Sequence, residues 1–467
     1  MLFNDDTIIA LATPPMGYSA ISVIRLSGKQ SISTVDSLFI SAKHGKKLKD
    51  QSTHTIHLGY ISDKKNQELI DQVLISIFRE PCSYTGENMI EISCHGSQYI
   101  QEYIIKLFLQ QGQGIRLAKP GEFTFRAFLN KKIDLSQAEA ISDIICSENK
   151  TNHEISLQQI KGTLKKSIKS LRKKLLNFSS LLELELDFPE ENIPYLKKSA
   201  LLSILKDLQV SLINLIESFS LGNSIKTGIV VVIIGNTNVG KSTLFNKILQ
   251  ENRSIVSHVS GTTRDCLEGN VILKGIPFRF VDTAGIRKTT NPIELLGINK
   301  TIKSIKDAHV ILYLFEADDG IEKQKQIIKN IKTLNEKYPM KKIFAIANKS
   351  DISSFQDFCN LHSSVIIFNI SSKNNQGINK LLDVLSKFFL DQFAKKRIIV
   401  TNNRHYEALK KTLEEISMAY NALNNNISID LISIHIRESF RFLGEITGEI
   451  TNEEVLSNIF SKFCIGK

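Results

Sequence analysis

The sequence of 467 residues has no tryptophan, only 9 prolines and only 6 cysteines. The cysteines are scattered without any Cys-x-x-Cys spacing, which favours neither a disulfide framework nor a zinc site. The longest apolar runs, such as 229–234, end well before the roughly 20 residues that a membrane helix needs. Asp5 and Asp6 stand where a secretory signal carries lysines, so we expect a protein of the reducing cytoplasm.

Positive charge, in contrast, is in excess. Lysine and arginine number 59 against 48 aspartates and glutamates, which gives a formal net charge of +11. This excess permits a nucleic-acid partner without proving one, because it is spread over a long chain. Basic runs such as Arg172 to Lys174 favour a solvated helix face, with contact to RNA phosphates as the alternative. A hydrophobic fraction of 42% excludes a disordered chain, and the length suggests about three domains.

Residues 1–118 alternate short β-branched runs with turn signals. This pattern predicts strands at 19–26, 72–78 and 88–93 and a helix at 98–110, typical of a small α+β domain. From Ser136 the pattern changes to long helices. One is expected at 154–188, interrupted by Gly162, and another at 198–220. Their apolar stripes indicate helix packing.

Residues 228–390 alternate strand and helix signals, which predicts a doubly wound, mostly parallel sheet. Strands are expected at 229–234, 271–273, 278–281, 310–315, 343–347 and 365–370. After residue 395 the helical pattern resumes and continues to Lys467. We therefore predict an α/β domain (223–390) inserted into an all-α helical domain (119–222 and 391–467), preceded by the small α+β domain (1–118).

A phosphate-binding loop is the strongest motif. Gly235-Asn-Thr-Asn-Val-Gly240-Lys241-Ser242 lies directly after an apolar strand and before a helical run. The glycines let backbone N–H groups turn towards phosphate oxygens, Lys241 reaches the β- and γ-phosphates, and the Ser242 hydroxyl can bind Mg²⁺. Because the required strand and helix are both present, an accidental glycine-rich turn is the weaker interpretation.

Three further motifs at predicted strand ends favour a P-loop GTPase. Asp282-Thr-Ala-Gly285 can hold the magnesium shell and approach the γ-phosphate. Asp351, in Asn348-Lys-Ser-Asp, can accept from the N1–H and the 2-amino group of guanine, a pairing that adenine lacks. Ser371-Ser-Lys can complete the base pocket. The predicted GTP-binding residues are Asn238, Val239, Gly240, Lys241, Ser242, Thr243, Ser257, His258, Val259, Ser260, Gly261, Thr262, Thr263, Asp282, Thr283, Ala284, Gly285, Asn348, Lys349, Asp351, Ser371, Ser372 and Lys373.

The sequence gives less direct evidence for the residues that would promote GTP hydrolysis. Many regulatory GTPases place a water-orienting glutamine where this chain has Ile286, which has no polar group. Glu294 is a candidate for that role, with an exposed glutamate at a helix start as the alternative. Asn238 can bind a monovalent cation such as K⁺, which would supply the charge of an arginine finger. Residues 257–265 form the expected switch loop.

Together these residues resemble the MnmE (TrmE) family of bacterial tRNA-modification GTPases along nearly the whole chain. GNTNVGKST, GTTRD and DTAG carry the resemblance in the α/β domain, although related GTPases share them. ATPP and VIRLSG near the start, PGEFTFRAFLNKKIDLSQAEAISD at 120–143 and the final FCIGK are more specific. Ser372 replaces the usual alanine of the base loop, and Ser97 replaces a common glycine after His95-Gly96.

The resemblance implies a folate-binding, dimerising N-terminal domain and GTPase domains that dimerise when K⁺ is bound. It also implies a heterotetramer with the FAD-dependent protein MnmG. Such complexes add a carboxymethylaminomethyl or aminomethyl group to C5 of the wobble uridine of certain tRNAs. The one-carbon unit comes from a tetrahydrofolate derivative, in its 5-formyl or methylene form.

Site residues carried over from the family fall into four groups. K⁺ would be bound by Asn238, Ser257, Val259 and Thr262, and Mg²⁺ by Ser242 and Thr263. The catalytic residues would be Glu294, which orients the attacking water, and Lys241, which contacts the β- and γ-phosphates. Folate would be bound by Arg25, Glu91, Lys132 and Lys467. Without the family, Arg25 and Lys132 would be interpreted as surface charges and Glu91 as an exposed strand residue.

Two alternatives stay open. Cys464 is either an inert, small apolar residue or a thiol beside the folate carbon or the modified uridine, a role that needs a lowered thiol pKa. The second alternative is a ribosome-assembly GTPase switch that binds rRNA. Such relatives carry a KH domain with a GxxG loop after the GTPase domain, whereas the segment after residue 395 has no GxxG.

Overall fold

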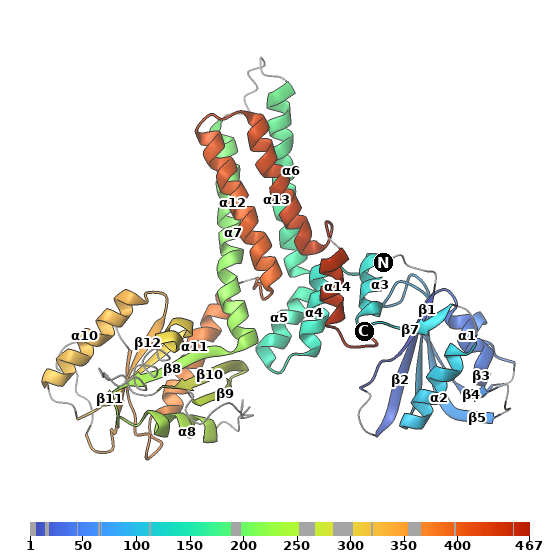
Figure 1. Ribbon diagram of the computed structural model, residues 1–467, viewed down its shortest axis with the longest axis horizontal. Coiled ribbons are helices and arrows are strands. Elements are labelled where there is room, and N and C mark those ends of the chain that lie inside the picture. Colours follow the sequence, from blue (N-terminus) through green and yellow to red (C-terminus); the bar gives the residue numbers. More distant parts are fainter. Residues whose placement is uncertain are drawn as a thin grey trace. The chain divides into compact units, whose positions relative to one another are not determined.

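The computed structural model of the chain describes residues 6–14, 18–43, 45–63, 66, 68–111, 114–187, 198–251, 267–283, 302–318, 321–353, 366–396, 398–451 and 453–467. The chain divides into two compact units (Figure 1). The first contains residues 1–146, 156–208 and 414–467, and the second contains residues 147–155 and 209–413. Each unit has one β-sheet among the described residues.

The strands of the first unit are β1 (Thr7–Leu11), β2 (Ser19–Ser27), β3 (Phe39–Ser41), β4 (Thr55–Asp63), β5 (Glu68–Phe78), β6 (Met89–Gly96) and β7 (Ile115–Leu117). They form a sheet in the order β3-β4-β5-β6-β2-β1-β7, antiparallel except for the β1–β7 pair. Alternate side chains are buried, such as Val73, Ile75 and Ile77 of β5. They pack under helices α1 (Ser31–Leu38) and α2 (Gln98–Leu109), and a short 3-10 helix lies at Leu48–Asp50. The predicted α+β domain is confirmed.

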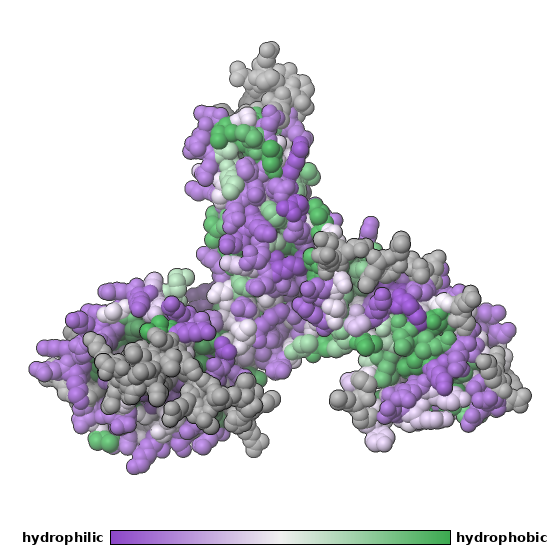
Figure 2. Space-filling view, in the orientation of Figure 1, coloured by the Kyte–Doolittle hydropathy of each residue, from purple (hydrophilic) through white to green (hydrophobic). Residues whose placement is uncertain are grey.

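The other face of this sheet exposes apolar side chains. Leu58 and Leu74 lie opposite each other in the β4–β5 register and are 47% and 44% exposed. Ile56 and Ile21 lie on the same face and are 67% and 61% exposed. Figure 2 shows apolar residues on the surface of the part of the chain that contains this sheet, without distinguishing its two faces. Isolated apolar side chains are normal on a surface, but exposed neighbours such as Leu58 and Leu74 mark a face that another surface can cover.

Helices make up most of the remaining structure outside the second sheet. They are α3 (Glu122–Leu129), α4 (Leu135–Ile145), α5 (Lys150–Ile160), α6 (Thr163–Asp187), α7 (Lys198–Thr227), α12 (Asn403–Asn424), α13 (Ile429–Thr447) and α14 (Glu453–Ser461). Gly162, with a φ of 78°, separates α5 from α6 at the predicted interruption. The apolar stripe predicted on α6 is buried, at Leu164, Ile168, Leu171, Leu175, Phe178 and Leu182. The long helices are therefore confirmed as packed helices.

Helix α7 differs from the expectation that no segment is apolar enough to span a bilayer. By length and composition it is the one described helix that could do so, with a mean hydropathy of 1.4 over 18 residues, 28% of them buried. The core helix of a water-soluble protein can satisfy the same two criteria. Here Leu201, Leu205, Leu208 and Leu212 recur at intervals of three and four and are buried, which is the pattern of helix packing.

The sheet of the second unit contains β8 (Ile229–Gly235), β9 (Leu267–Leu273), β10 (Ile276–Asp282), β11 (Val310–Glu316), β12 (Lys342–Asn348) and β13 (Ile366–Asn369). Its order is β13-β12-β11-β8-β10-β9, and only β9 is antiparallel to its neighbour. Helices α8 (Lys241–Glu251) and α11 (Ile378–Lys395) pack on one face, and α10 (Ile321–Lys337) packs on the other. The predicted doubly wound sheet is confirmed, and the carboxyl ends of β8, β10 and β12 meet at one edge.

Candidate functional site

The phosphate-binding loop lies between β8 and α8, and two glycines fix its path. Gly235 has a φ of 153°, and a Cβ placed there would lie 2.3 Å from the carbonyl oxygen of Leu314 on the adjacent strand. Gly240 has a φ of 92°, and a Cβ there would lie 2.4 Å from Nδ2 of Asn348. Neither position leaves room for a side chain, so the loop backbone passes close to two neighbouring strand ends.

Lys241 and Asp282 form the charged centre of this loop, and each is only 8% exposed. The Lys241 ammonium donates to the carbonyl oxygens of Asn236 at 2.8 Å and Gly235 at 3.2 Å. Burial lowers the pKa of Lys241, although Asp282 opposes the change. Burial also raises the pKa of Asp282, against the hydrogen bond from the Ser242 hydroxyl and the charge of Lys241. Burial thus disfavours the charged form of both groups, and a ligand of opposite charge at each would stabilise it.

Mg²⁺ fits the oxygens that Ser242 and Asp282 present. One oxygen of the Asp282 carboxylate, Oδ1, is buried and has no hydrogen-bond partner among the described residues. A buried carboxylate oxygen without a partner is costly unless a ligand completes it. Hydroxyl and carboxylate oxygens are the hard donors that Mg²⁺ prefers. Mg²⁺ held there would neutralise charge on the nucleotide phosphates.

The predicted base-recognition residues are joined to the phosphate loop through Asn348. Its side-chain nitrogen donates to the Val239 carbonyl oxygen at 2.7 Å, and its Oδ1 accepts from the backbone and the hydroxyl of Ser372 at 3.0 and 2.9 Å. The Ser371 hydroxyl donates to Asp351 at 2.6 Å and, with nearby lysines, lowers the pKa of that exposed carboxyl. Asp351 is therefore held as a carboxylate, the form that the predicted guanine contact requires.

A second cluster lies in the first unit, around Arg25. Its guanidinium donates to Glu91 Oε1 from Nε at 2.9 Å and from Nη2 at 2.6 Å, and to the carbonyl oxygen of Gly466 from Nη1 at 2.9 Å. The same guanidinium lies 5.7 Å from the ring centroid of Tyr84 and 5.6 Å from that of Phe123. Arg25 is thus neither a free surface charge nor a buried core residue.

The final residues of the sequence complete this cluster. Burial, with the charge of Arg25, lowers the pKa of Lys467, and Glu91 and Cys464 oppose the change. The Cys464 carbonyl accepts from the Gly121 amide at 3.4 Å, while Cys464 itself is exposed. A Cβ on Gly121 would lie 2.5 Å from the carbonyl oxygen of Phe460, so only glycine permits this approach. These contacts bring Arg25, Glu91, Lys467 and Cys464 into one neighbourhood.

Lys132 approaches from the side of the loop between β5 and β6. Its ammonium donates to the carbonyl oxygen of Pro81 at 2.9 Å. The same loop carries Tyr84, whose hydroxyl shares a 2.8 Å hydrogen bond with Thr124. All four predicted folate residues therefore border one loop or the Arg25 cluster.

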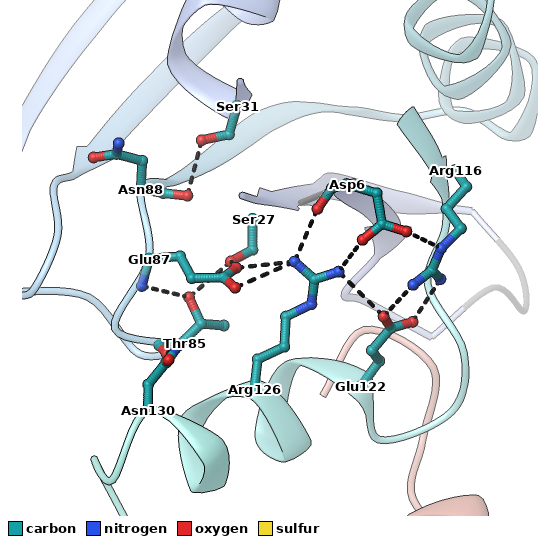
Figure 3. A network of polar contacts seen from close by, with 10 residues as sticks. All are labelled: Asp6, Ser27, Ser31, Thr85, Glu87, Asn88, Arg116, Glu122, Arg126 and Asn130. Carbon is teal, nitrogen blue, oxygen red and sulfur yellow. Dashed lines mark hydrogen bonds and ion pairs between the residues drawn. The ribbon is translucent and has the colours of Figure 1, made fainter. Parts of the chain in front are cut away.

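A buried ionic network anchors this loop and α3 (Figure 3). Arg126, 3% exposed, bonds to Asp6 at 2.8 Å, Glu87 at 3.1 Å and Glu122 at 3.3 Å. Arg116 adds bonds of 2.6 Å to Asp6 and 2.5 Å to Glu122. Burial alone would raise the pKa values of Asp6 and Glu122, but the two arginines outweigh it and lower both.

Comparison with known proteins identifies the chain. The MnmE helical domain model matches residues 135–464, and the model of the GTP-binding protein TrmE N-terminus matches residues 7–132. A tRNA modification GTPase MnmE of Flavobacterium johnsoniae is 46% identical over 100% of both chains. The chain belongs to the MnmE family. The MnmE of Bacteroides thetaiotaomicron is 42% identical over 99% of this chain and 100% of its own length.

Among solved structures, Aquifex aeolicus Era bound to GDP and aluminium fluoride is 27% identical. It covers 41% of this chain and 67% of its own, with a TM-score of 0.27. The assignment to the MnmE family of P-loop GTPases rests on the full-length relatives and the family models, not on this structural overlap.

For this MnmE-family chain, the remaining predicted site residues lie outside the described residues. They are Ser257, His258, Val259, Ser260, Gly261, Thr262, Thr263, Ala284, Gly285 and Glu294. The described part brings together Asn238, Val239, Gly240, Lys241, Ser242, Thr243, Asp282, Thr283, Asn348, Lys349, Asp351, Ser371, Ser372 and Lys373 at one sheet edge.

Sequence reasoning missed the aromatic residues beside Arg25. Tyr84 lies between Pro81 and Gly86 in a turn-rich segment, which by itself predicts only a loop. Phe123 lies in the PGEFTF segment, where it resembles any apolar residue at a helix start. No local pattern indicates that both rings face an arginine on a distant strand.

Proposed function

We propose that this chain is the K⁺-activated, GTP-hydrolysing half of an enzyme that modifies C5 of the wobble uridine in certain tRNAs. It would act in the cytoplasm with an FAD-dependent, MnmG-like partner and add an aminomethyl or carboxymethylaminomethyl group. The observation that carries the proposal is the Arg25 cluster, because the guanine-nucleotide motifs alone are shared with GTPases of other functions. The proposed domain bounds remain 1–118, 119–222 with 391–467, and 223–390.

The Arg25 cluster has the chemistry to bind a tetrahydrofolate derivative, which supplies the one-carbon unit. Glu91 can accept from the pterin amino group and ring N–H, and Arg25 holds that carboxylate in place with two hydrogen bonds. Lys132 and Lys467 are the cations available for the glutamyl carboxylates. Cys464 is the exposed thiol of the cluster, available to the carbon unit or to the uridine.

In the nucleotide site, Lys241 would neutralise the β- and γ-phosphates while Ser242 binds Mg²⁺, with Thr263 as the second protein ligand. Asn238, which adopts a φ of 67° within the phosphate loop, would bind K⁺ together with Ser257, Val259 and Thr262. Glu294 would orient the water, since Ile286 has no polar group to do so. A cation between the phosphates can stabilise the charge of the transition state.

A homodimer through the N-terminal sheet is part of the proposal. The exposed face of Ile21, Ile56, Leu58 and Leu74 is the same face that carries Arg25 and Glu91, as the strand register requires. A second copy covering this face would bury its apolar side chains and enclose the neighbouring cluster.

Nucleoside mass spectrometry of tRNA from cells that lack the protein tests the proposal. We expect the C5-modified wobble uridine to disappear and to return with the wild-type gene but not with an Arg25→Ala variant. A full complement of modified uridine, accompanied by immature rRNA, would instead favour the ribosome-assembly alternative. GTP hydrolysis should also be much faster in K⁺ than in Na⁺, and equal rates would contradict the cation site.

A further inference from the structure

A basic stretch runs from the turn after α5 along α6 and lies outside both sites. Residues 155–182 contain seven lysines and arginines and no aspartate or glutamate, in a chain whose net charge is +11. A solvated helix usually intersperses the two signs, because opposite charges three or four residues apart stabilise it. The cations are Lys161, Lys165, Lys166, Lys169, Arg172, Lys173 and Lys174.

Two of these cations have structural partners. Lys165 Nζ lies 3.6 Å from Asp134 Oδ2. Arg172 Nη1 lies 2.5 Å from Glu449 Oε2, and its guanidinium lies 5.9 Å from the ring centroid of Phe440. Both side chains therefore link α6 to neighbouring segments, and each charge is paired with a carboxylate of the same chain.

Lys166, Lys169 and Lys173 differ from that pair. All three are exposed, and their ammonium groups have no ion-pair or hydrogen-bond partner within the described ranges. Their spacing of three and four residues puts them on one face of α6, about 4.5 and 6 Å apart along the axis. That face is opposite the buried side, which includes Leu164, Ile168, Leu171 and Leu175. We call these three residues the α6 lysine stripe.

The stripe is unfavourable for the isolated helix. Each like-charge pair three or four residues apart costs about 0.2–0.5 kcal/mol. Lys166 also lies in the first turn of α6, where the helix dipole disfavours cations. A single glutamate on this exposed face would relieve both effects without disturbing the core. A repeated external anion would relieve them as well.

We propose that the α6 lysine stripe binds the phosphate backbone of the tRNA substrate, an inference that rests on the proposed function. RNA offers regularly repeated phosphates, and lysine contacts to them give affinity without base specificity. An anionic membrane is the other extended anion. A helix that lies on a membrane needs an apolar face free to enter the lipid, whereas the apolar side of α6 is buried.

The test compares two full-length triple variants that lose the same charge. The first carries Lys166→Gln, Lys169→Gln and Lys173→Gln. The matched control carries Lys325→Gln, Lys329→Gln and Lys332→Gln, which remove three exposed lysines from α10 at similar spacing. Binding of a transcribed tRNA is measured by fluorescence anisotropy over a series of KCl concentrations. Circular dichroism melts verify that both variants fold.

We expect the first variant to bind tRNA at least about tenfold more weakly at 0.1 M salt. The slope of log affinity against log salt should fall by about 2–3, roughly one for each lost phosphate contact. The control should keep the wild-type slope. Equal losses in both variants would overturn the proposal, because net charge alone would then explain them.

Further outcomes separate the stripe from the proposed function. Unchanged tRNA binding by the first variant, with full restoration of the modified uridine in cells, would refute the stripe and leave the function intact. If the first variant lost binding to phosphatidylserine vesicles but kept tRNA binding, the stripe would be a membrane-binding surface and the tRNA proposal would be refuted. A wild-type protein that binds no tRNA would also overturn the stripe, whereas the cellular nucleoside profile tests the function separately.

Discussion

Replacing Arg126 with methionine should destabilise the N-terminal domain substantially. The guanidinium is 3% exposed and bonds three carboxylates, those of Asp6, Glu87 and Glu122. Removing one side of a buried ionic network typically costs about 3–5 kcal/mol, because the remaining charges stay desolvated. Methionine preserves much of the volume, so the cost is mainly electrostatic.

The remaining contacts place the expected cost at the lower end of that range. After the substitution, Asp6 and Glu122 keep Arg116, at 2.6 and 2.5 Å. Glu87 keeps the Ser27 hydroxyl at 2.8 Å. No carboxylate loses every partner, so we expect about 3 kcal/mol. Arg116→Met is the matched control: Arg116 is 39% exposed, and about 1 kcal/mol is expected.

The loss should also depend on pH. Both Asp6 and Glu122 have lowered pKa values in the folded chain, so their stabilisation is present above the ordinary carboxyl pKa of about 4. It is lost as the pH falls through the lowered values. The deficit of Arg126→Met relative to wild type should therefore be largest near neutral pH and should narrow below about pH 4.

Hydrogen exchange with mass spectrometry can locate the effect. Peptides from α3 and β1 should exchange faster in Arg126→Met, by about the factor that 3 kcal/mol implies, roughly 100-fold, if exchange there requires opening of the network. Peptides from β8, in the second unit, should be unchanged. Wild-type exchange in α3 at neutral pH would refute the reasoning, because the network would then not be stabilising.

Three further outcomes are expected. Gly240→Ala should weaken GTP binding by at least about 100-fold in a calorimetric titration, because the added Cβ would lie 2.4 Å from Nδ2 of Asn348. Near-normal affinity would mean that the loop adjusts freely. Asp351→Asn should lower GTP affinity by about 100-fold or more and raise the affinity for xanthosine triphosphate, since the amide can donate where the carboxylate only accepts. Parallel losses of affinity for both nucleotides would contradict a role of Asp351 in recognising the base. Affinity for a folate analogue should fall as the pH rises through the lowered pKa of Lys467, and Lys467→Gln should abolish this dependence, which a persisting slope would disprove.

The nucleotide site could be predicted from the sequence because its parts are local. Gly235, Lys241 and Ser242 lie within one strand–loop–helix unit, and Asp282 and Asn348 lie at the ends of strands that parallel topology brings together. The bond from Asn348 to Val239 could not be predicted, since it depends on the order of β12, β11 and β8 across the sheet.

The Arg25 cluster shows where local patterns stop being informative. Periodicity predicts β2 and β6 but not that Arg25 faces Glu91 across them, because that pairing depends on register. In the ionic network, only Glu122 and Arg126 have a spacing of four that a helix pattern can suggest. Asp6 and Glu87 reach the same arginine from segments that are distant in the chain, so the network follows from the tertiary fold alone.

The bond from Arg25 to Gly466 spans 441 positions of sequence. A ribosome makes Arg25 early, and the α/β domain is synthesised before Gly466 emerges. The N-terminal sheet can therefore fold during synthesis, while its Arg25 cluster must wait until residues 464–467 have been made. A chain interrupted after the α/β domain could still bind GTP but would lack Lys467 and Cys464. The Arg25 cluster therefore depends on a segment that is synthesised long after the N-terminal sheet, so chains that stop after the α/β domain would lack part of this cluster.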